Sequence, residues 1–263
     1  TTRLVGSEMC IRDSIIIEVI MKTKKRKTTK ITVPTALALI CCFAVILIIN
    51  NQPTENTAKD EIISLKDIPD YSGSAFIEIN GNEPYFSDDD YTTSSFEYYA
   101  DLDELGRCGT AYACVGTDIM PTEERGQIGR IKPSGWQTVK YDFIDGKYLY
   151  NRCHLIAYQL TGENANEKNL ITGTRYLNVT GMLPFENMVA NYVKTTGNHA
   201  LYRVTPVFEN DNLVAKGVLI EAKSVEDKGE GVTLCVYCYN VQPNVTIDYK
   251  TCLLYTSPSP RDA

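Results

Sequence analysis

The sequence predicts a mixed α+β fold in which β-strands dominate. Three observations carry this prediction: short segments rich in β-branched and aromatic residues, turn residues between them, and one amphipathic helix. The chain has 263 residues, 43% of them hydrophobic. That length suits one domain of roughly 150–200 residues with appendages, and the composition excludes a chain that is disordered throughout.

Six segments have strand composition, and turn residues separate several of them. The first ends at an Asn80-Gly81 turn, which is a strong strand-ending signal. The expected strands are residues 75–80, 147–155, 169–178 (a strand or a loop), 200–208, 213–222 and 232–241. In contrast, residues 87–101 are acidic and aromatic, and the Gly-, Thr- and Pro-containing residues 106–140 are expected to be irregular.

The one clear helix is expected over residues 183–194. Phe185, Met188, Val189 and Tyr192 recur at helical spacing and would form a single apolar face. Pro184 lies in the first turn, where proline is tolerated because its missing N–H has no partner there. This pattern predicts an amphipathic helix.

A basic and then apolar stretch lies near the N-terminus. Residues 22–30 carry six Lys and Arg, and residues 33–49 are almost uniformly apolar. Such a pattern is typical of a secretory signal or a short membrane anchor, and the lack of a small-residue cleavage site after Ile49 favours an anchor. We therefore expect contact with the membrane here and export of everything that follows.

The two ends lack helical and strand periodicity. Residues 5–14 and 252–263 resemble translated sequencing-adapter read-through. The expected organisation is a non-native extension at 1–20, a basic flank with signal or anchor at 21–50, a linker at 51–72, the folded domain at 73–251 and a non-native tail at 252–263.

Charge limits the classes of function. Residues 61–250 contain 16 Lys and Arg against 27 Asp and Glu, a formal net charge of −11. This excludes a basic nucleic-acid coat protein. An anionic substrate would have to be met by a local basic site, because the overall field repels it.

The five cysteines of the exported part suggest two pairs. Cys108 and Cys114 flank a short Gly-containing segment and could form a disulfide or remain thiols. Cys235 and Cys238 have C-x-x-C spacing, but in a strand an offset of three residues places the two side chains on opposite faces. That argues against a zinc site.

Three polar residues suggest a catalytic site. His154 lies in NRCHL, Asn178 follows 24 residues later and Glu186 eight residues after that. A histidine can take a proton from water at neutral pH, an amide oxygen can hold a mostly hydrated Mg²⁺, and a carboxylate can orient the surrounding water. Together these groups suit phosphodiester hydrolysis. Cys153 and His154 are not expected to act as a thiol-protease pair, because adjacent strand residues point to opposite faces.

The run NRCHL…NLITGTRYLN…FE resembles the DNA/RNA non-specific endonucleases of the ββα-metal (His-Me finger) class, especially the streptococcal-type secreted DNases and DNA-entry nucleases. The family signature is Asp-Arg-Gly-His, with Asn-Arg-Ser-His in the streptococcal branch. Here Asn151 and Cys153 occupy the first and third positions. The resemblance implies a ββα-metal core on a mostly antiparallel sheet, and Mg²⁺ as cofactor with Mn²⁺ as the alternative.

The resemblance also implies roles for individual residues. His154 matches the general base, Asn178 the metal ligand, Glu186 the residue that braces water around the metal, and Arg152 the arginine that approaches the phosphate. From its position alone, Arg175 is expected to reach the same cleft, with a surface salt bridge as the alternative, and Arg203 is a weaker candidate for substrate binding. Asn187 and Asn191 compete with Asn178 as ligand.

The resulting hypothesis is a secreted or membrane-anchored, metal-dependent endonuclease that cuts DNA, and in the alternative RNA, to leave 5′-phosphate ends. It would act outside the cell or on the outer face of the cytoplasmic membrane, and no protein partner is inferred. A second hypothesis is an exported β-rich binding module that kept the fold but lost catalysis, which the acidic balance favours. A third is a toxin nuclease, although residues 60–140 contain no delivery motif.

Overall fold

The computed structural model describes residues 64–250 and 254–256, which lie within one compact unit, Glu61–Ala263. The predicted extension, basic flank, apolar segment and linker up to residue 63 lie outside the described residues, as do Cys10, Cys41, Cys42 and Cys252. In the described part of the chain, no helix has the length and hydropathy of a membrane span.

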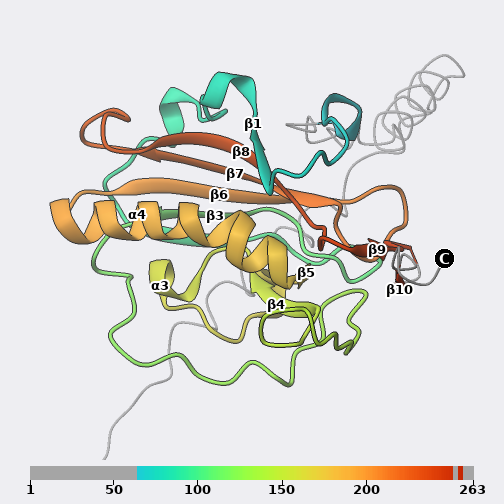
Figure 1. Cartoon of the computed structure of the whole chain (residues 1–263). Helices are drawn as coiled ribbons and strands as arrows, with labels where there is room; N and C mark the ends of the chain where they lie inside the picture. Colours follow the sequence, from blue (N-terminus) through green and yellow to red (C-terminus); the bar gives the residue numbers. More distant parts are fainter. Residues whose placement is uncertain (1–63, 251–253, 257–263) are drawn as a thin grey trace, which may run out of the picture. The chain divides into compact units, whose positions relative to one another are not determined.

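A six-stranded antiparallel sheet forms the larger part of the fold (Figure 1). Its strand order is β1-β8-β7-β6-β3-β2, and every neighbouring pair is antiparallel. The strands are β1 (Phe76–Glu78), β2 (Phe96–Tyr99), β3 (Ala111–Val115), β6 (Ala200–Val207), β7 (Gly217–Ser224) and β8 (Thr233–Tyr239). The α+β class and the mostly antiparallel sheet are therefore confirmed.

Strand β3 corrects the expectation that residues 106–140 are irregular. It lies between β2 and β6, and Ala111, Ala113 and Val115 are fully buried. Its two alanines are poor strand formers, so local composition did not reveal it. Its pairing with β2 and β6 makes it a strand, and its small side chains lie in the hydrophobic core.

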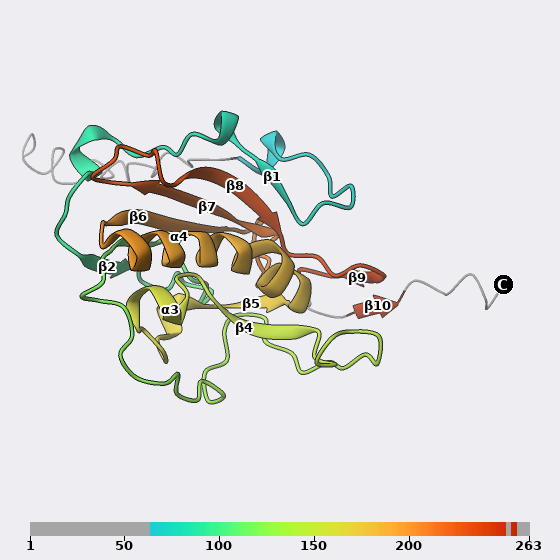
Figure 2. The same cartoon turned by 60° about the vertical axis from the view of Figure 1, so that its left-hand side comes forward.

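A second, smaller sheet pairs β4 (Tyr150–His154) with β5 (Leu170–Thr174) in antiparallel register. Both views place the long helix α4 (Leu183–Thr196) between this pair and the six-stranded sheet (Figure 1, Figure 2). The short helix α3 (Tyr158–Thr161) lies in the connection from β4 to β5. The segment expected as a strand or loop at 169–178 is a strand as far as Thr174, and its last residues are helical, which the sequence did not predict.

Helix α4 follows the predicted boundaries closely, with a proline in its first turn and Gly197 as a left-handed C-cap at φ 73°. Phe185, Val189 and Tyr192 are buried as expected. Met188 was expected on the apolar face but is 45% exposed. The buried stripe is centred on Val189 and Val193, so Met188 falls at its edge.

The two faces of the six-stranded sheet bury different cores. The larger core joins the sheet to α4 and to the β4–β5 pair, and the smaller core lies on the opposite face under residues such as Leu65 and Tyr71. Cys238 belongs to the larger core and Cys235 to the smaller, so the two thiols lie on opposite faces of β8, as their spacing predicted.

Cys108 and Cys114, the other pair considered, do not form a disulfide. Cys108 and Cys114 are both buried, free thiols. Cys108 donates to the Leu170 carbonyl, and Cys114 to the Thr92 carbonyl. Of the two alternatives, the structure shows separate thiols.

Short elements complete the fold. An antiparallel pair joins β9 (Val245–Ile247) to β10 (Leu254–Thr256), which lies within the tail that resembles adapter sequence. A π-helix spans Leu177–Met182 and runs directly into α4. Single 3-10 turns lie at Leu65–Asp67, Asn80–Asn82, Asp88–Asp90 and Glu167–Asn169.

Candidate active site

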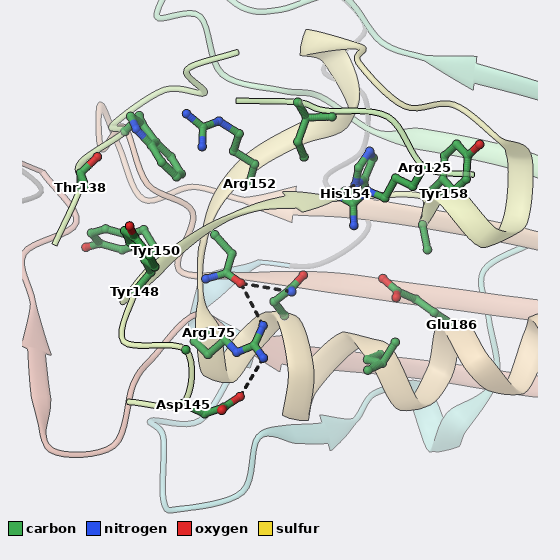
Figure 3. A pocket seen from close by; sticks show the side chains of 17 residues that line it. Arg125, Thr138, Asp145, Tyr148, Tyr150, Arg152, His154, Tyr158, Arg175 and Glu186 are labelled. Atoms are coloured by element: carbon green, nitrogen blue, oxygen red, sulfur yellow. Dashed lines mark hydrogen bonds and ion pairs between the residues drawn. The ribbon is translucent and has the colours of Figure 1, made fainter. Parts of the chain in front are cut away.

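A cleft of about 660 Å³ runs along β4 and over the start of α4 (Figure 3). Five of the six predicted site residues line it: Arg152, His154, Arg175, Asn178 and Glu186. The structure thus brings together groups from β4, from the turn after β5 and from α4. This is the convergence that the histidine, asparagine and glutamate spacing predicted.

The alternation of side chains along β4 explains which residues face the cleft. Tyr148, Tyr150, Arg152 and His154 are two residues apart and all line it. Cys153 points the other way into the larger core and is fully buried. The prediction that Cys153 and His154 point to opposite faces is therefore confirmed, and the two cannot act as nucleophile and base.

His154 is held by both ring nitrogens and is only 6% exposed. Its Nε2 lies 2.8 Å from the Asn164 carbonyl oxygen, and its Nδ1 lies 3.1 Å from the Arg125 guanidinium. Because Nε2 faces a carbonyl, that nitrogen carries the proton, and Nδ1 accepts from Arg125. Burial lowers the pKa of His154 to about 4; the Asn164 carbonyl opposes this shift, and the Arg125 charge adds to it. The imidazole is neutral at neutral pH.

Glu186 lies in the first turn of α4 and is 7% exposed. Burial raises its pKa to about 8, and the Arg125 charge opposes part of this rise. Among the described residues, no hydrogen-bond donor or basic side chain contacts its carboxylate. A buried carboxylate normally has such partners, so this one lacks the compensation that the fold provides elsewhere.

Asn178 lies in the π-helix, facing Asn151 on β4. Its Nδ2 lies 3.4 Å from the Asn151 Oδ1, and the same oxygen lies 3.5 Å from Nη1 of Arg175. Because the amide nitrogen of Asn178 faces Asn151, its carbonyl oxygen is left to other partners. Asn151 therefore orients two side chains of the cleft at once.

Arg152 and Arg175 line the cleft but are already partly engaged. Arg152 donates from Nε to the Ile131 carbonyl at 2.5 Å, and its guanidinium lies 3.9 Å from the centre of the Trp136 ring. Arg175 forms an ion pair with Asp145 at 2.7 Å. The cleft position and the surface salt bridge, which were alternatives for Arg175, are both observed. Its Nε is buried and has no acceptor among the described residues.

Several candidates lie elsewhere. Arg203 is outside the cleft, on β6, where Nε and Nη2 donate to the Glu221 carboxylate at 2.7 and 2.8 Å. Asn187 and Asn191 are exposed and do not line the cleft, so neither faces the site as Asn178 does. The second histidine, His199, is bound to a surface glutamate.

Sequence reasoning missed two residues that contact the histidine. Arg125 lies in the segment expected to be irregular, and a Cβ at the following Gly126 would lie 2.7 Å from the side chain of Asn164. The Arg-Gly pair was thus a weak signal of close packing. Asn164 contributes its main-chain carbonyl, which every residue type has, so no sequence signal could have identified it.

The fold and the cleft define the class of protein. Two antiparallel strands followed by a helix, with a histidine at the end of the first strand and a carboxylate on the helix, form a ββα-metal nuclease core. Residues 87–226 match the model of the DNA/RNA non-specific endonuclease family. The chain belongs to this family, as its sequence motifs indicated. It is a nuclease, a hydrolase whose substrate is nucleic acid.

Solved structures agree with this assignment. NucA from Streptococcus agalactiae with magnesium bound is 26% identical, with a TM-score of 0.63 over 70% of this chain and 87% of that chain. The same nuclease without metal matches equally well, over 74% of this chain and 92% of that chain. Sda1 nuclease with a bound zinc ion is 28% identical, with a TM-score of 0.53 over 62% and 81%. No curated protein matches the chain.

Proposed function

We propose that the chain is a divalent-metal-dependent endonuclease that hydrolyses phosphodiester bonds of DNA, with RNA as the alternative substrate. One observation carries the proposal. A single cleft presents a neutral imidazole, whose proton-accepting Nδ1 is not held by a carboxylate, together with a buried carboxylate that no donor of the described residues contacts.

His154 is the general base in this proposal. Its Nδ1 has the lone pair that can accept a proton, and the Asn164 carbonyl on Nε2–H would stabilise the positive imidazolium once a water proton arrives. Nδ1 must first lose the hydrogen bond from Arg125. A phosphate oxygen is a stronger acceptor for a guanidinium than an imidazole nitrogen. Substrate would therefore draw Arg125 away and raise the pKa of His154 at the same time.

Asn178 and Glu186 fit a hydrated divalent cation. In the part of the chain that the structure describes, no donor occupies the amide oxygen of Asn178, which can act as a ligand, and no basic side chain forms an ion pair with Glu186. The NucA structure with magnesium supports Mg²⁺, and Mn²⁺ is the alternative. When bound, such an ion supplies positive charge that stabilises the phosphate and the leaving oxygen. Glu186 would hold the water around it.

Arg175 and Arg152 would position the substrate. Arg175 keeps a buried Nε that has no acceptor among the residues that the structure describes, and it can exchange the exposed Asp145 for a phosphate. Contacts of this kind reach the sugar-phosphate backbone and not the base edges, so cleavage should show little sequence preference. Attack of water in line with the 3′ oxygen would leave a 5′-phosphate. The composition of residues 22–49 supports action outside the cell.

The test is a plasmid-nicking assay with Mg²⁺ and with EDTA on the wild type, His154→Ala and His199→Ala. We expect nicking only with the metal, a loss of roughly 10²- to 10⁴-fold in His154→Ala, and near wild-type activity in His199→Ala. Equal rates in the wild type and His154→Ala would sink the assignment of the base. DNA binding without nicking by the wild type would favour the alternative of a binding module.

A further inference from the structure

The end of the cleft away from His154 is aromatic. Figure 3 shows Tyr148 and Tyr150 at one end, and His154 and Glu186 at the other. Tyr150 is buried, but Tyr148 is 47% exposed, and Trp136 lines the same cleft. Tyr148 therefore presents an accessible ring to the space that leads to the catalytic histidine.

The backbone holds Tyr148 in place although its side chain is exposed. Residues 139–149 form a hairpin in which Tyr148 bridges Lys140, and the Leu149 amide donates to the Val139 carbonyl at 3.0 Å. Ile144 at the tip is 4% exposed and packs in a small core with Leu149. A ring on a fixed hairpin loses little conformational entropy when it binds a ligand, so this position suits recognition.

Cations accompany these rings. The Lys140 ammonium lies 4.6 Å from the centre of the Tyr148 ring, and the Arg152 guanidinium lies 3.9 Å from that of Trp136. Arg175 lines the cleft between the aromatic and catalytic ends. Positive groups that follow a phosphate backbone, with an accessible ring beside them, are the two components of single-stranded nucleic-acid binding sites.

We infer that Tyr148 is a subsite that stacks on an unpaired nucleobase of the strand whose phosphate lies at His154. The inference rests on the proposed function and specifies its substrate. Six residues of extended chain separate Tyr148 from His154, roughly 20 Å, so the stacked base belongs to a nucleotide a few positions from the cut. Bases in a duplex are stacked on one another and cannot reach the ring. Single-stranded or locally opened nucleic acid is therefore the preferred substrate, with little preference among bases.

Binding in EDTA tests the subsite without turnover. Trp136 is the only tryptophan in the sequence, so its fluorescence reports occupancy of the cleft. The probes are an oligothymidylate, an abasic oligonucleotide of the same length and a duplex of that length. We expect the single strand to quench Trp136 and to bind at least about fivefold more tightly than the abasic strand, because stacking on one aromatic ring contributes that much.

Three variants separate stacking from other effects. Tyr148→Ala should lose the preference for the oligothymidylate and keep its affinity for the abasic strand, while Tyr148→Phe should retain both. Phe143→Ala is the matched control, because Phe143 is 58% exposed on the same hairpin but does not line the cleft. It should behave as the wild type.

Two results would overturn the subsite: the same preference in Tyr148→Ala as in the wild type, or no base-dependent quenching in the wild type. Failure of the proposed function is a different result, because it appears in the nicking assay with Mg²⁺ and not in this metal-free titration. A wild type that nicks plasmid but binds abasic and base-containing strands equally would disprove the subsite alone.

Discussion

Two buried glutamates show how differently this fold treats a charge in its interior. Glu221, on β7, is fully buried and accepts hydrogen bonds from Nε and Nη2 of Arg203 and from the Tyr85 amide, at 2.7 to 2.8 Å. Glu186, on α4, is almost as deeply buried, yet none of the described residues donates to it. The charge of Glu221 is therefore balanced by Arg203, while Glu186, once ionised, has no ion-pair partner among the described residues.

The difference supports the proposal that Glu221 is a structural group and Glu186 a functional one. A buried charge without a partner is costly, and such groups are concentrated at sites where something from solution binds. Glu186 faces the cleft, so a cation can supply the missing partner. Arg203 and Glu221 pair with each other away from the cleft. The guanidinium that made Arg203 a candidate for substrate binding instead donates to Glu221 within the sheet.

The largest effect is expected from breaking the balanced pair. Glu221→Ala leaves Arg203, whose side chain is only 13% exposed, without its counterion. We expect a loss of about 3–5 kcal/mol in the free energy of unfolding, measured by urea denaturation. The folded fraction should still nick plasmid at the wild-type rate. A loss below about 1 kcal/mol would contradict the view that Glu221 is structural.

The unbalanced glutamate should respond in the opposite way. Glu186→Gln removes a charge that the metal-free fold does not compensate, so stability at pH 8 should be unchanged or higher. Activity with Mg²⁺ should fall by roughly 10- to 100-fold, in a nicking assay with a Mg²⁺ titration. The exposed Glu230→Gln serves as the control. Destabilisation of Glu186→Gln without loss of activity would reverse the two assignments.

The pH dependence of stability sharpens the same contrast. The pKa of Glu186 rises on folding from an ordinary value of 4.5 to about 8, so the metal-free fold favours the protonated carboxyl. Its contribution to the free energy of unfolding is fully present below pH 4.5 and is lost as the pH rises towards 8. In EDTA, the midpoint of thermal unfolding should fall between pH 5 and 8 more in the wild type than in Glu186→Gln.

His154 contributes with the opposite sign. Its pKa is lowered from 6.5 to about 4, so its contribution is present above pH 6.5 and is lost as the pH falls towards 4. Because the wild type and Glu186→Gln both keep His154, its loss of stability below pH 6.5 should be common to both, and their scans should separate only as the pH rises from 4.5 towards 8. Parallel curves for the wild type and Glu186→Gln would show that Glu186 is not held in its protonated form.

The smallest effect is expected at Asn151, which orients Asn178 and Arg175 through long hydrogen bonds of 3.4 and 3.5 Å. Asn151→Ala should reduce the nicking rate roughly fivefold, because such a bond contributes about 1 kcal/mol. Asn151→Asp keeps an acceptor in the same place and should recover most of that loss. If the aspartate variant is slower than the alanine variant, Asn151 does not act as an acceptor for these two side chains.

The sequence supported some of these conclusions and could not support others. His154, Asn178 and Glu186 could be found because residue type and spacing together match a family pattern, and α4 because its apolar positions recur at helical spacing. Strand β3 was missed because alanine has a low strand propensity, and its alanines are in a strand only because β2 and β6 pair with them on either side. Arg203 was misleading because its partner, Glu221, lies across a strand pair whose register the sequence does not show.

The π-helix Leu177–Met182 makes the site sensitive to the number of residues in this segment. On a regular α-helix, residues eight apart are rotated by about 80° around the axis. A π-helix has more residues per turn and therefore rotates each residue by less. This reduces the angle between Asn178 and Glu186, so both can face one cleft. Deleting a single residue here would leave a continuous helix that still folds but turns the amide away. Length variation in this turn should therefore be far less tolerable than in the surface loops, where insertions cost little.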